Sequence, residues 1–302
     1  MQKSPILAWV LLFVLAFIWG SSFILLNKGL IGLTPEEVGS LRIVAASLFL
    51  LPAGIKRFKF VERKKMIYLV SVGFLGSLVP AFLFAIAQTQ LESAITGVLN
   101  GLVPIFTILI ALIFLKQKQS KAVYIGVFIG FIGTAILITA GEGNALQGIN
   151  AYALLVVLAT ICYASNLNVI KEKLSDLHAV TVTSGSLLLV GPIAIIYLFG
   201  FTDFWHKINY VEGTGIATFY ISLLGILGTA IALIIFNKVL QMKDALFASS
   251  VTYIIPVFAV MWGVLDGENL YVMHYIGMIA VGIGVYIANT NRAAYKKTGS
   301  TK

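Results

Sequence analysis

The sequence predicts an all-α, polytopic membrane protein: ten transmembrane helices in two inverted five-helix repeats, with both termini in the cytoplasm. Three observations support this prediction. Apolar stretches long enough to cross a bilayer recur ten times, Lys and Arg gather in every second connection, and the second half repeats short motifs of the first. The composition agrees, because 11% of the 302 residues are charged, against about 25% in soluble domains.

Each predicted span has about the 20 mainly apolar residues that a transmembrane helix needs. The ten stretches cover roughly residues 7–28, 36–55, 66–90, 93–115, 122–140, 151–170, 179–200, 215–238, 245–265 and 272–290. We expect the first stretch to be retained as a span, since no small-residue cleavage site follows it. Continuous apolar runs also favour helices over the alternating strands of a β-barrel.

The distribution of charge predicts the orientation. Eighteen of the 21 Lys and Arg residues lie at the termini or in alternate connections, and the other connections carry mostly acids. Cytoplasmic loops hold the excess of Lys and Arg, so both termini are expected inside. The net charge of +9 thus reflects topology, and the lack of a contiguous basic face or motif argues against a nucleic-acid partner.

An internal repeat divides the chain into residues 1–140 and 151–302, joined by a Gly/Asn-rich connection at 141–150. Because each half has five spans, an odd number, the halves enter the membrane from opposite sides. Such inverted repeats place a substrate site near the bilayer midplane and allow alternating access to it. The clearest matches are Gly73-Phe-Leu-Gly76-Ser77 with Gly225-Ile-Leu-Gly228-Thr229, and Pro104 with Pro256.

Two prolines near the middle of the fourth and ninth spans indicate where this site lies. Pro104 and Pro256 each free the carbonyl four residues earlier, at Asn100 and Thr252, which also have polar side chains. Free acceptors at membrane depth suit a substrate cavity. The alternative is that both prolines only bend their helices against neighbouring spans.

Aromatic and polar side chains deep in the first and sixth spans are further candidates for substrate contact. They are Trp19 and Ser22 in the first span and Tyr163, Ser165 and Asn166 in the sixth. They lie too centrally to be interfacial anchors, and their mixture suits a pocket for a small amphipathic solute. The alternative is helix packing through the small residues beside them.

Arg42 is the only basic residue well inside a predicted span, where a charge is costly enough to suggest a function. It lies about 9 Å along the helix from the outer end of the second span. We therefore expect its side chain to reach outward to Glu36, Glu37 or the lipid interface; contact with the solute is the alternative. No Asp or Glu lies near the middle of a span, which weakens a proton-relay mechanism.

The sequence predicts no catalytic, metal or cofactor site. Cys162 is the single cysteine, and the three histidines lie far apart. Glycine-rich faces in the fifth and tenth spans suit packing within one chain or a homodimer. We expect a non-enzymatic monomer or homodimer whose partners are the lipid bilayer and a small-molecule substrate.

Several short motifs, in order, resemble the EamA branch of the drug/metabolite transporter superfamily, and the resemblance covers essentially the whole chain. In the first half they are residues 18–23 (IWGSSF), Leu41-Arg42, Pro80 and Pro104. In the second half they are residues 159–166 as a weaker opening motif, then Pro256, Gly267-Glu268 and residues 275–277.

This resemblance implies a ten-helix exporter of small metabolites such as amino acids, in a prokaryotic cytoplasmic (inner) membrane. It implies a cavity lined by spans 1, 3, 4, 6, 8 and 9. Carried onto this sequence, the matching positions are Trp19, Ser22, Pro80, Pro104 and Pro256. The family often has Gly-Glu after the fourth span, where this chain has Lys116-Gln117, whereas Glu268 keeps the pair in the second half. An inner gate closed by such a glutamate would therefore be asymmetric.

Two other functions stay open: a lipid, nucleotide-sugar or sugar-phosphate translocator of the same fold, and an integral-membrane enzyme acting on lipid. Polyanionic cargo is disfavoured because Arg42 is the single cationic candidate for the cavity. The enzyme is disfavoured because no clustered acid–base or metal-binding motif is present.

Overall fold

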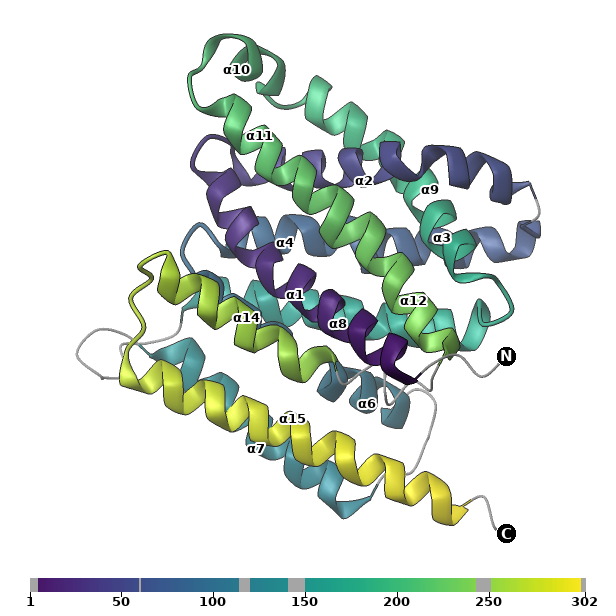
Figure 1. Cartoon of the computed structure of the whole chain (residues 1–302), viewed down its shortest axis with the longest axis vertical. Helices are drawn as coiled ribbons and strands as arrows, with labels where there is room; N and C mark the ends of the chain where they lie inside the picture. The colour runs from purple at the N-terminus through teal and green to yellow at the C-terminus, as the bar shows by residue number, and fades with distance from the viewer. Residues whose placement is uncertain (1–4, 60, 114–119, 141–149, 243–250, 300–302) are drawn as a thin grey trace.

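The computed structural model describes residues 5–59, 61–113, 120–140, 150–242 and 251–299. Over these ranges the chain forms helices and short connections, without a β-strand (Figure 1). Seven helices are long and apolar enough to cross a membrane, and three shorter apolar helices lie at Lys121–Leu137, Ile254–Leu265 and Val272–Ile287. The all-helical, polytopic class is therefore confirmed, while ten crossings and inverted topology stay predictions. The predicted connection at 141–150 falls almost wholly outside the described residues.

The elements are best followed in chain order. The first half contains α1 (Pro5–Leu30), α2 (Pro35–Phe58), η1 (Arg63–Lys65), α3 (Met66–Gly73), η2 (Phe74–Leu78), α4 (Val79–Ala87), α5 (Ser93–Asn100), α6 (Val103–Ile113) and α7 (Lys121–Thr139). The second half contains α8 (Ala151–Lys173), α9 (Ala179–Gly200), α10 (Phe204–Tyr210), α11 (Thr214–Leu223), η4 (Leu224–Ile231), α12 (Ala232–Met242), α14 (Val251–Leu265) and α15 (Val272–Gly299). Both η2 and η4 are π-helices.

Three apolar segments are irregular where the sequence predicted continuous helices. The π-helices η2 and η4 interrupt two of them, at the positions matched by the Gly-x-x-Gly repeat. In the third, α5 ends at Asn100 and α6 begins at Val103. Pro104 therefore lies well inside this apolar segment, as predicted, but the segment is not one continuous helix. The proline occupies the first turn of α6, where a missing N–H costs no helical hydrogen bond. Pro256 does lie inside α14.

The principal helix contacts join the two halves. Along one edge of the bundle α7 packs against α15 (Figure 1), and α2 packs against α9 elsewhere. The pair α5 and α14 is also in contact. Around them, α1 contacts α14, α11 and α12, whereas α8 contacts α6, α4 and α3. The halves are thus interleaved, and the core lies between them.

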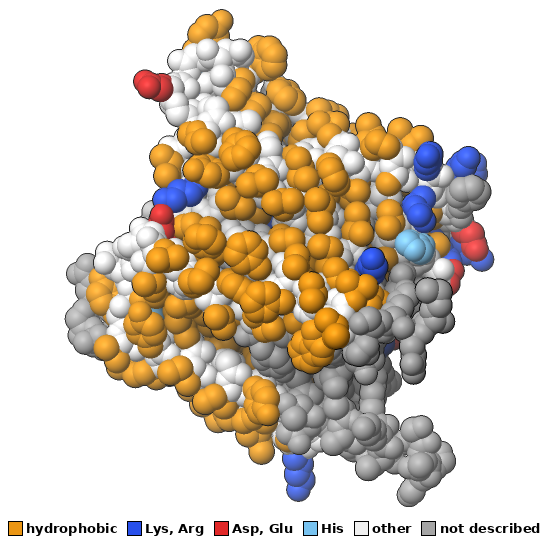
Figure 2. Space-filling view, viewed as in Figure 1, with side chains coloured by type: hydrophobic (Ala, Val, Ile, Leu, Met, Phe, Trp, Pro, Cys, Tyr) orange, Lys and Arg blue, Asp and Glu red, His pale blue; other side chains and the backbone are white. Residues whose placement is uncertain are grey.

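Large apolar side chains cover the sides of the bundle. Phe13, Phe128, Ile196, Phe219 and Ile279, from five different helices, are each more than half exposed. Figure 2 shows hydrophobic side chains across most of one face, with Lys and Arg most frequent at its right-hand rim. In the same view α1 starts and α15 ends toward that right-hand end. Such continuous apolar surface fits lipid contact.

Candidate functional site

Polar side chains from both halves meet at the π-helix η4. Trp19 donates from Nε1 to the carbonyl oxygen of Gly228 at 3.0 Å. Arg42 donates from Nε to Thr229 Oγ1, also at 3.0 Å. The hydroxyl of Tyr163, on α8, lies close to the same guanidinium. We call the following residues the central cluster: Trp19, Ser22, Arg42, Tyr163 and Thr229.

Ser22 closes the central cluster on the α1 side. It is 8% exposed and donates its hydroxyl to Ile18 O of its own helix at 2.8 Å. A Cβ added to Gly228 would lie 2.7 Å from the Ser22 oxygen. The close approach of α1 to η4 therefore depends on that glycine, and it is what allows Trp19 to reach the η4 backbone.

Arg42 does not reach outward as the sequence suggested. Its backbone carbonyl lies against Gly225, where an added Cβ would be 2.5 Å away, but its side chain bonds to Thr229, one turn further on. That turn leads away from the end of the bundle where α2 and α11 both begin. The expected partner Glu37 instead accepts from Thr34 N at 2.8 Å and from Lys207 Nζ at 3.0 Å. Because Glu37 is already satisfied, the guanidinium turns toward the interior.

Two of the predicted residues of α8, Tyr163 and Asn166, face the first half of the chain. Tyr163 stacks on Phe84 with ring centroids 6.0 Å apart. Asn166, one turn further along α8, lies against η2, so that a Cβ on Gly76 would be 2.5 Å from its Nδ2. Asn166 Oδ1 is buried and accepts no hydrogen bond. Ser165 is half-buried, on the opposite side of α8 from Tyr163.

A second contact between the halves, separate from the central cluster, lies where the break between α5 and α6 faces α14. Pro256 Cγ lies 3.9 Å from the position that a Cβ on Gly101 would take. Asn100, which ends α5, buries its Oδ1 without a hydrogen-bond donor. Thr252, one turn before Pro256, is half-buried. The structure therefore brings Pro256 against Gly101, the residue after Asn100, across the halves, whereas Pro104 is buried in α6.

Pro80 is buried in the first turn of α4, directly after η2. A proline there leaves the carbonyl of Gly76 without its usual helical donor. The repeat places Ala232 at the equivalent position after η4, so a π-helix forms there without a proline. Pro80 is therefore not the common cause of the two π-helices.

Glu268 joins the end of α14 to the start of α5 at one end of the bundle. The preceding Gly267 has φ 83°, which only glycine adopts readily, and it turns the chain back toward α5. The Glu268 carboxylate accepts from Ser93 N at 2.7 Å and from Ala94 N at 2.9 Å, the first two N–H groups of α5. A carboxylate at a helix N-terminus also interacts favourably with the helix dipole. We call Glu268, Ser93 and Ala94 the latch.

Further contacts hold α1 and α4 to the same end. Lys28 Nζ lies 2.5 Å from Asp266 Oδ1. Gln88 Nε2 donates to Phe23 O at 3.0 Å. Burial, and then the nearby negative charge of Glu268, raises the pKa of Glu92. Lys116 and Gln117, the counterparts of the Gly-Glu pair in the first half, lie outside the described residues.

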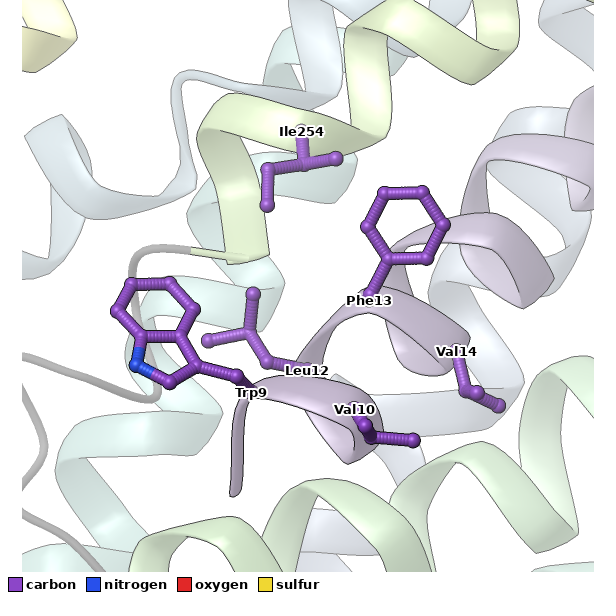
Figure 3. A pocket seen from close by; sticks show the side chains of 6 residues that line it. All are labelled: Trp9, Val10, Leu12, Phe13, Val14 and Ile254. Carbon is purple, nitrogen blue, oxygen red and sulfur yellow. The ribbon is translucent and has the colours of Figure 1, made fainter. Parts of the chain in front are cut away.

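Two surface hollows were not predicted. One, of about 360 Å³, lies where α1 and α14 diverge (Figure 3) and is lined only by apolar side chains: Trp9, Val10, Leu12, Phe13, Val14 and Ile254. It offers no polar group to orient a solute, so we place the candidate site at the central cluster instead. The other, of about 290 Å³, is partly polar and lies beside the latch, with Asn27, Gln88 and Thr89 in its wall.

Sequence reasoning missed three features of the central cluster and the latch end: Thr229, Gln88 and the Lys28–Asp266 ion pair. Thr229 escaped notice although it belongs to a repeated motif, because nothing in the pattern shows that a π-helix would turn it toward Arg42. Lys28 and Gln88 were read only as residues near the ends of predicted spans, and Asp266 only as an acid in a connection, since their partners lie elsewhere in the sequence. The sequence offered one signal for the contacts at the latch: Asp266 lies only two residues before Glu268.

Known proteins resemble this chain over nearly its whole length. The profile of the EamA-like transporter family matches residues 6–139 and 150–290. An uncharacterized transporter of Archaeoglobus fulgidus is 26% identical over 94% of this chain and 99% of its own length. The uncharacterized inner membrane transporter YedA of Escherichia coli is 24% identical over 93% of this chain and 90% of its own length.

One crystal structure is 16% identical and superposes with a TM-score of 0.65 over 97% of this chain and 100% of that one, so the two share a fold. The apolar helices and the relatives together make this protein a multi-pass protein of the prokaryotic inner membrane. The family profile covers far more than half of the sequence, in both halves. The chain therefore belongs to the EamA-like transporter family, the branch of the drug/metabolite transporter superfamily that its motifs resemble.

Proposed function

We propose that the protein exports small metabolites such as amino acids by alternating access, with two inverted five-helix halves moving about a midplane cavity. The observation that carries the proposal is the central cluster, which takes Trp19 and Arg42 from one half and Tyr163 and Thr229 from the other. A solute held there would contact both halves, so their relative movement would change its access to either side of the membrane.

The helix contacts support the inverted repeat. If each helix is replaced by its counterpart in the other half, the α1–α14 contact becomes α8–α6, α1–α12 becomes α8–α4, and α2–α11 becomes α9–α3. All six contacts are present. The contacts α2–α9 and α7–α15 map onto themselves. The same family profile also matches each half. This is the pattern expected of two similar units related by a two-fold axis.

The latch supports a proposal about the side of the membrane to which this conformation is closed. With both termini inside, the latch lies at the outer end, because it joins the end of α14 to the start of α5. We propose that the protein is here closed to the outside, and that release of Glu268 from α5 opens it. Arg42, Tyr163 and Trp19 are each half-buried in this conformation.

Metabolite profiling tests the function. Medium from cells that express the protein, compared with medium from cells that lack it, should contain one or more enriched small metabolites. The purified protein in liposomes should then move those compounds. Movement of lipid or of nucleotide sugars in place of small metabolites would identify the alternative translocator. No moving solute of any kind would reject transport by this chain.

A further inference from the structure

Arg42 is a cation in the apolar part of the bundle, and its described partners are neutral. Its Nε donates to Thr229 Oγ1, and its other close polar neighbour is the Tyr163 hydroxyl. The ion pairs among the described residues join other groups: Lys28–Asp266, Lys64–Glu62, Lys65–Asp176, His206–Asp203 and Lys207–Glu37. A guanidinium has five N–H donors, so several stay available beside this one bond to threonine.

An intramembrane guanidinium without an anion is energetically costly. Such residues pair with other groups or mark substrate pathways, and a planar guanidinium matches a carboxylate bidentately. The outward route to Glu37 is not used, because that carboxylate is held by Thr34 and Lys207. Arg42 is therefore oriented toward the solute site rather than toward the membrane surface.

The neighbours of Arg42 define what else the ligand would contain. Trp19 packs against Phe236 with ring centroids 5.5 Å apart, and Tyr163 stacks on Phe84, so aromatic pairs flank the cluster on the α1 and α8 sides. Asn166, one turn from Tyr163 on the same helix, is 9% exposed, and its Oδ1 accepts no hydrogen bond. A buried acceptor without a donor carries a cost, which a ligand N–H or O–H group would relieve.

We propose that Arg42 binds the carboxylate of the transported solute, and that the central cluster selects small carboxylates with an apolar part and a hydrogen-bond donor. This proposal rests on the proposed transport function and deepens it. Asn166 Oδ1 would accept from the donor of the solute, and the rings of Trp19, Tyr163 and Phe84 would contact its apolar part. Arg42 then increases the affinity for the solute and makes the site selective for a negative charge.

The test uses the purified full-length protein in liposomes. The twenty proteinogenic amino acids and a set of simple organic acids are offered first, together with a metabolite extract and glycerol 3-phosphate. Each carboxylate that moves is then compared with its own primary amide, which has nearly the same shape and no negative charge. Wild type is compared with Arg42→Gln, with Arg42→Lys, and with Arg57→Gln as a control near the other end of the same helix.

We expect each acid to move at least ten times faster than its amide in wild type. Loss of hydrogen bonds to a charged group should raise the half-saturating concentration of the acid about 10- to 100-fold in Arg42→Gln. Arg42→Lys should keep the preference for the acid and lose only part of the affinity, whereas Arg57→Gln should behave as wild type. Solute-dependent thermal stabilisation of each variant shows whether it is folded and able to bind.

Other results separate the possible failures. If solutes move but acid and amide are equivalent, or if Arg42→Gln keeps the preference, the carboxylate site is rejected and transport stands. Preferential movement of glycerol 3-phosphate, or an Arg42 effect that follows the phosphatidylglycerol content of the vesicles, would assign the arginine to phosphate and also reject the proposal. Absence of any moving solute rejects the transport function itself.

Discussion

The latch gives the most specific prediction about gating, and Glu268→Gln is the change that tests it. The carboxylate accepts two backbone N–H groups of α5, at 2.7 and 2.9 Å. Glutamine keeps one acceptor oxygen but removes the charge and one of the two bonds. A hydrogen bond to a charged group contributes about 1.5–3 kcal/mol. Because Glu268 is partly exposed, we expect a loss of about 1–2 kcal/mol, which shifts a closed–open equilibrium about 5- to 30-fold.

A buried cysteine beneath the latch reports this shift. In a Cys162→Ala background, Ser22→Cys places a thiol in the central cluster at a position that is 8% exposed. A membrane-impermeant thiol reagent added outside intact cells should label it about 5- to 30-fold faster when Glu268 is also replaced. Glu212→Gln removes an exposed acid before α11 and should leave the rate unchanged. Equal labelling rates with and without the Glu268→Gln replacement would refute the role of the latch.

Three more results are expected. Burial and Glu268 raise the pKa of Glu92, so its ionised form destabilises the fold. Glu92→Gln should therefore raise the thermal midpoint at about pH 7.5, and this gain should vanish below about pH 3.5, where the folded and unfolded states both carry the proton. A Cβ on Gly133 would lie 2.6 Å from Val281 N, whereas one on Gly282 would meet nothing within 4 Å; Gly133→Ala should therefore lower the unfolding temperature and Gly282→Ala should not. Asn100→Phe should abolish transport in liposomes while leaving the thermal midpoint near wild type, and normal transport would show that the α5–α6 break is not part of the solute path.

Much of the helical architecture could be predicted because lipid imposes it. A segment such as residues 179–200 can satisfy its backbone in a bilayer only as a helix, and α9 begins and ends where hydropathy changes. The breaks were harder to predict. Pro104 was expected to kink a continuous helix, but the chain ends α5 at Asn100 and uses the proline to begin α6. Hydropathy cannot distinguish these two outcomes, because both bury the same apolar residues.

The site was predictable in composition but not in partners. Trp19, Ser22 and Tyr163 were chosen for their depth and chemistry, and the structure brings them together around η4. The direction of Arg42 depended on whether Glu37 was free, and Lys207, 170 residues away, occupies that carboxylate. A pairing over such a separation leaves no periodic signal in one sequence. Thr229 was missed for the same reason.

The central claim is that the two halves cross the membrane in opposite directions, and matched single cysteines test it most directly. Ile31 lies in the α1–α2 connection, Ser175 lies in the equivalent α8–α9 connection, and both are exposed. In a Cys162→Ala background, an impermeant reagent should label Ile31→Cys on intact cells and Ser175→Cys only after the membrane is permeabilised. Labelling of both positions from the same side would mean that the halves are parallel, and the cavity between inverted repeats would not exist.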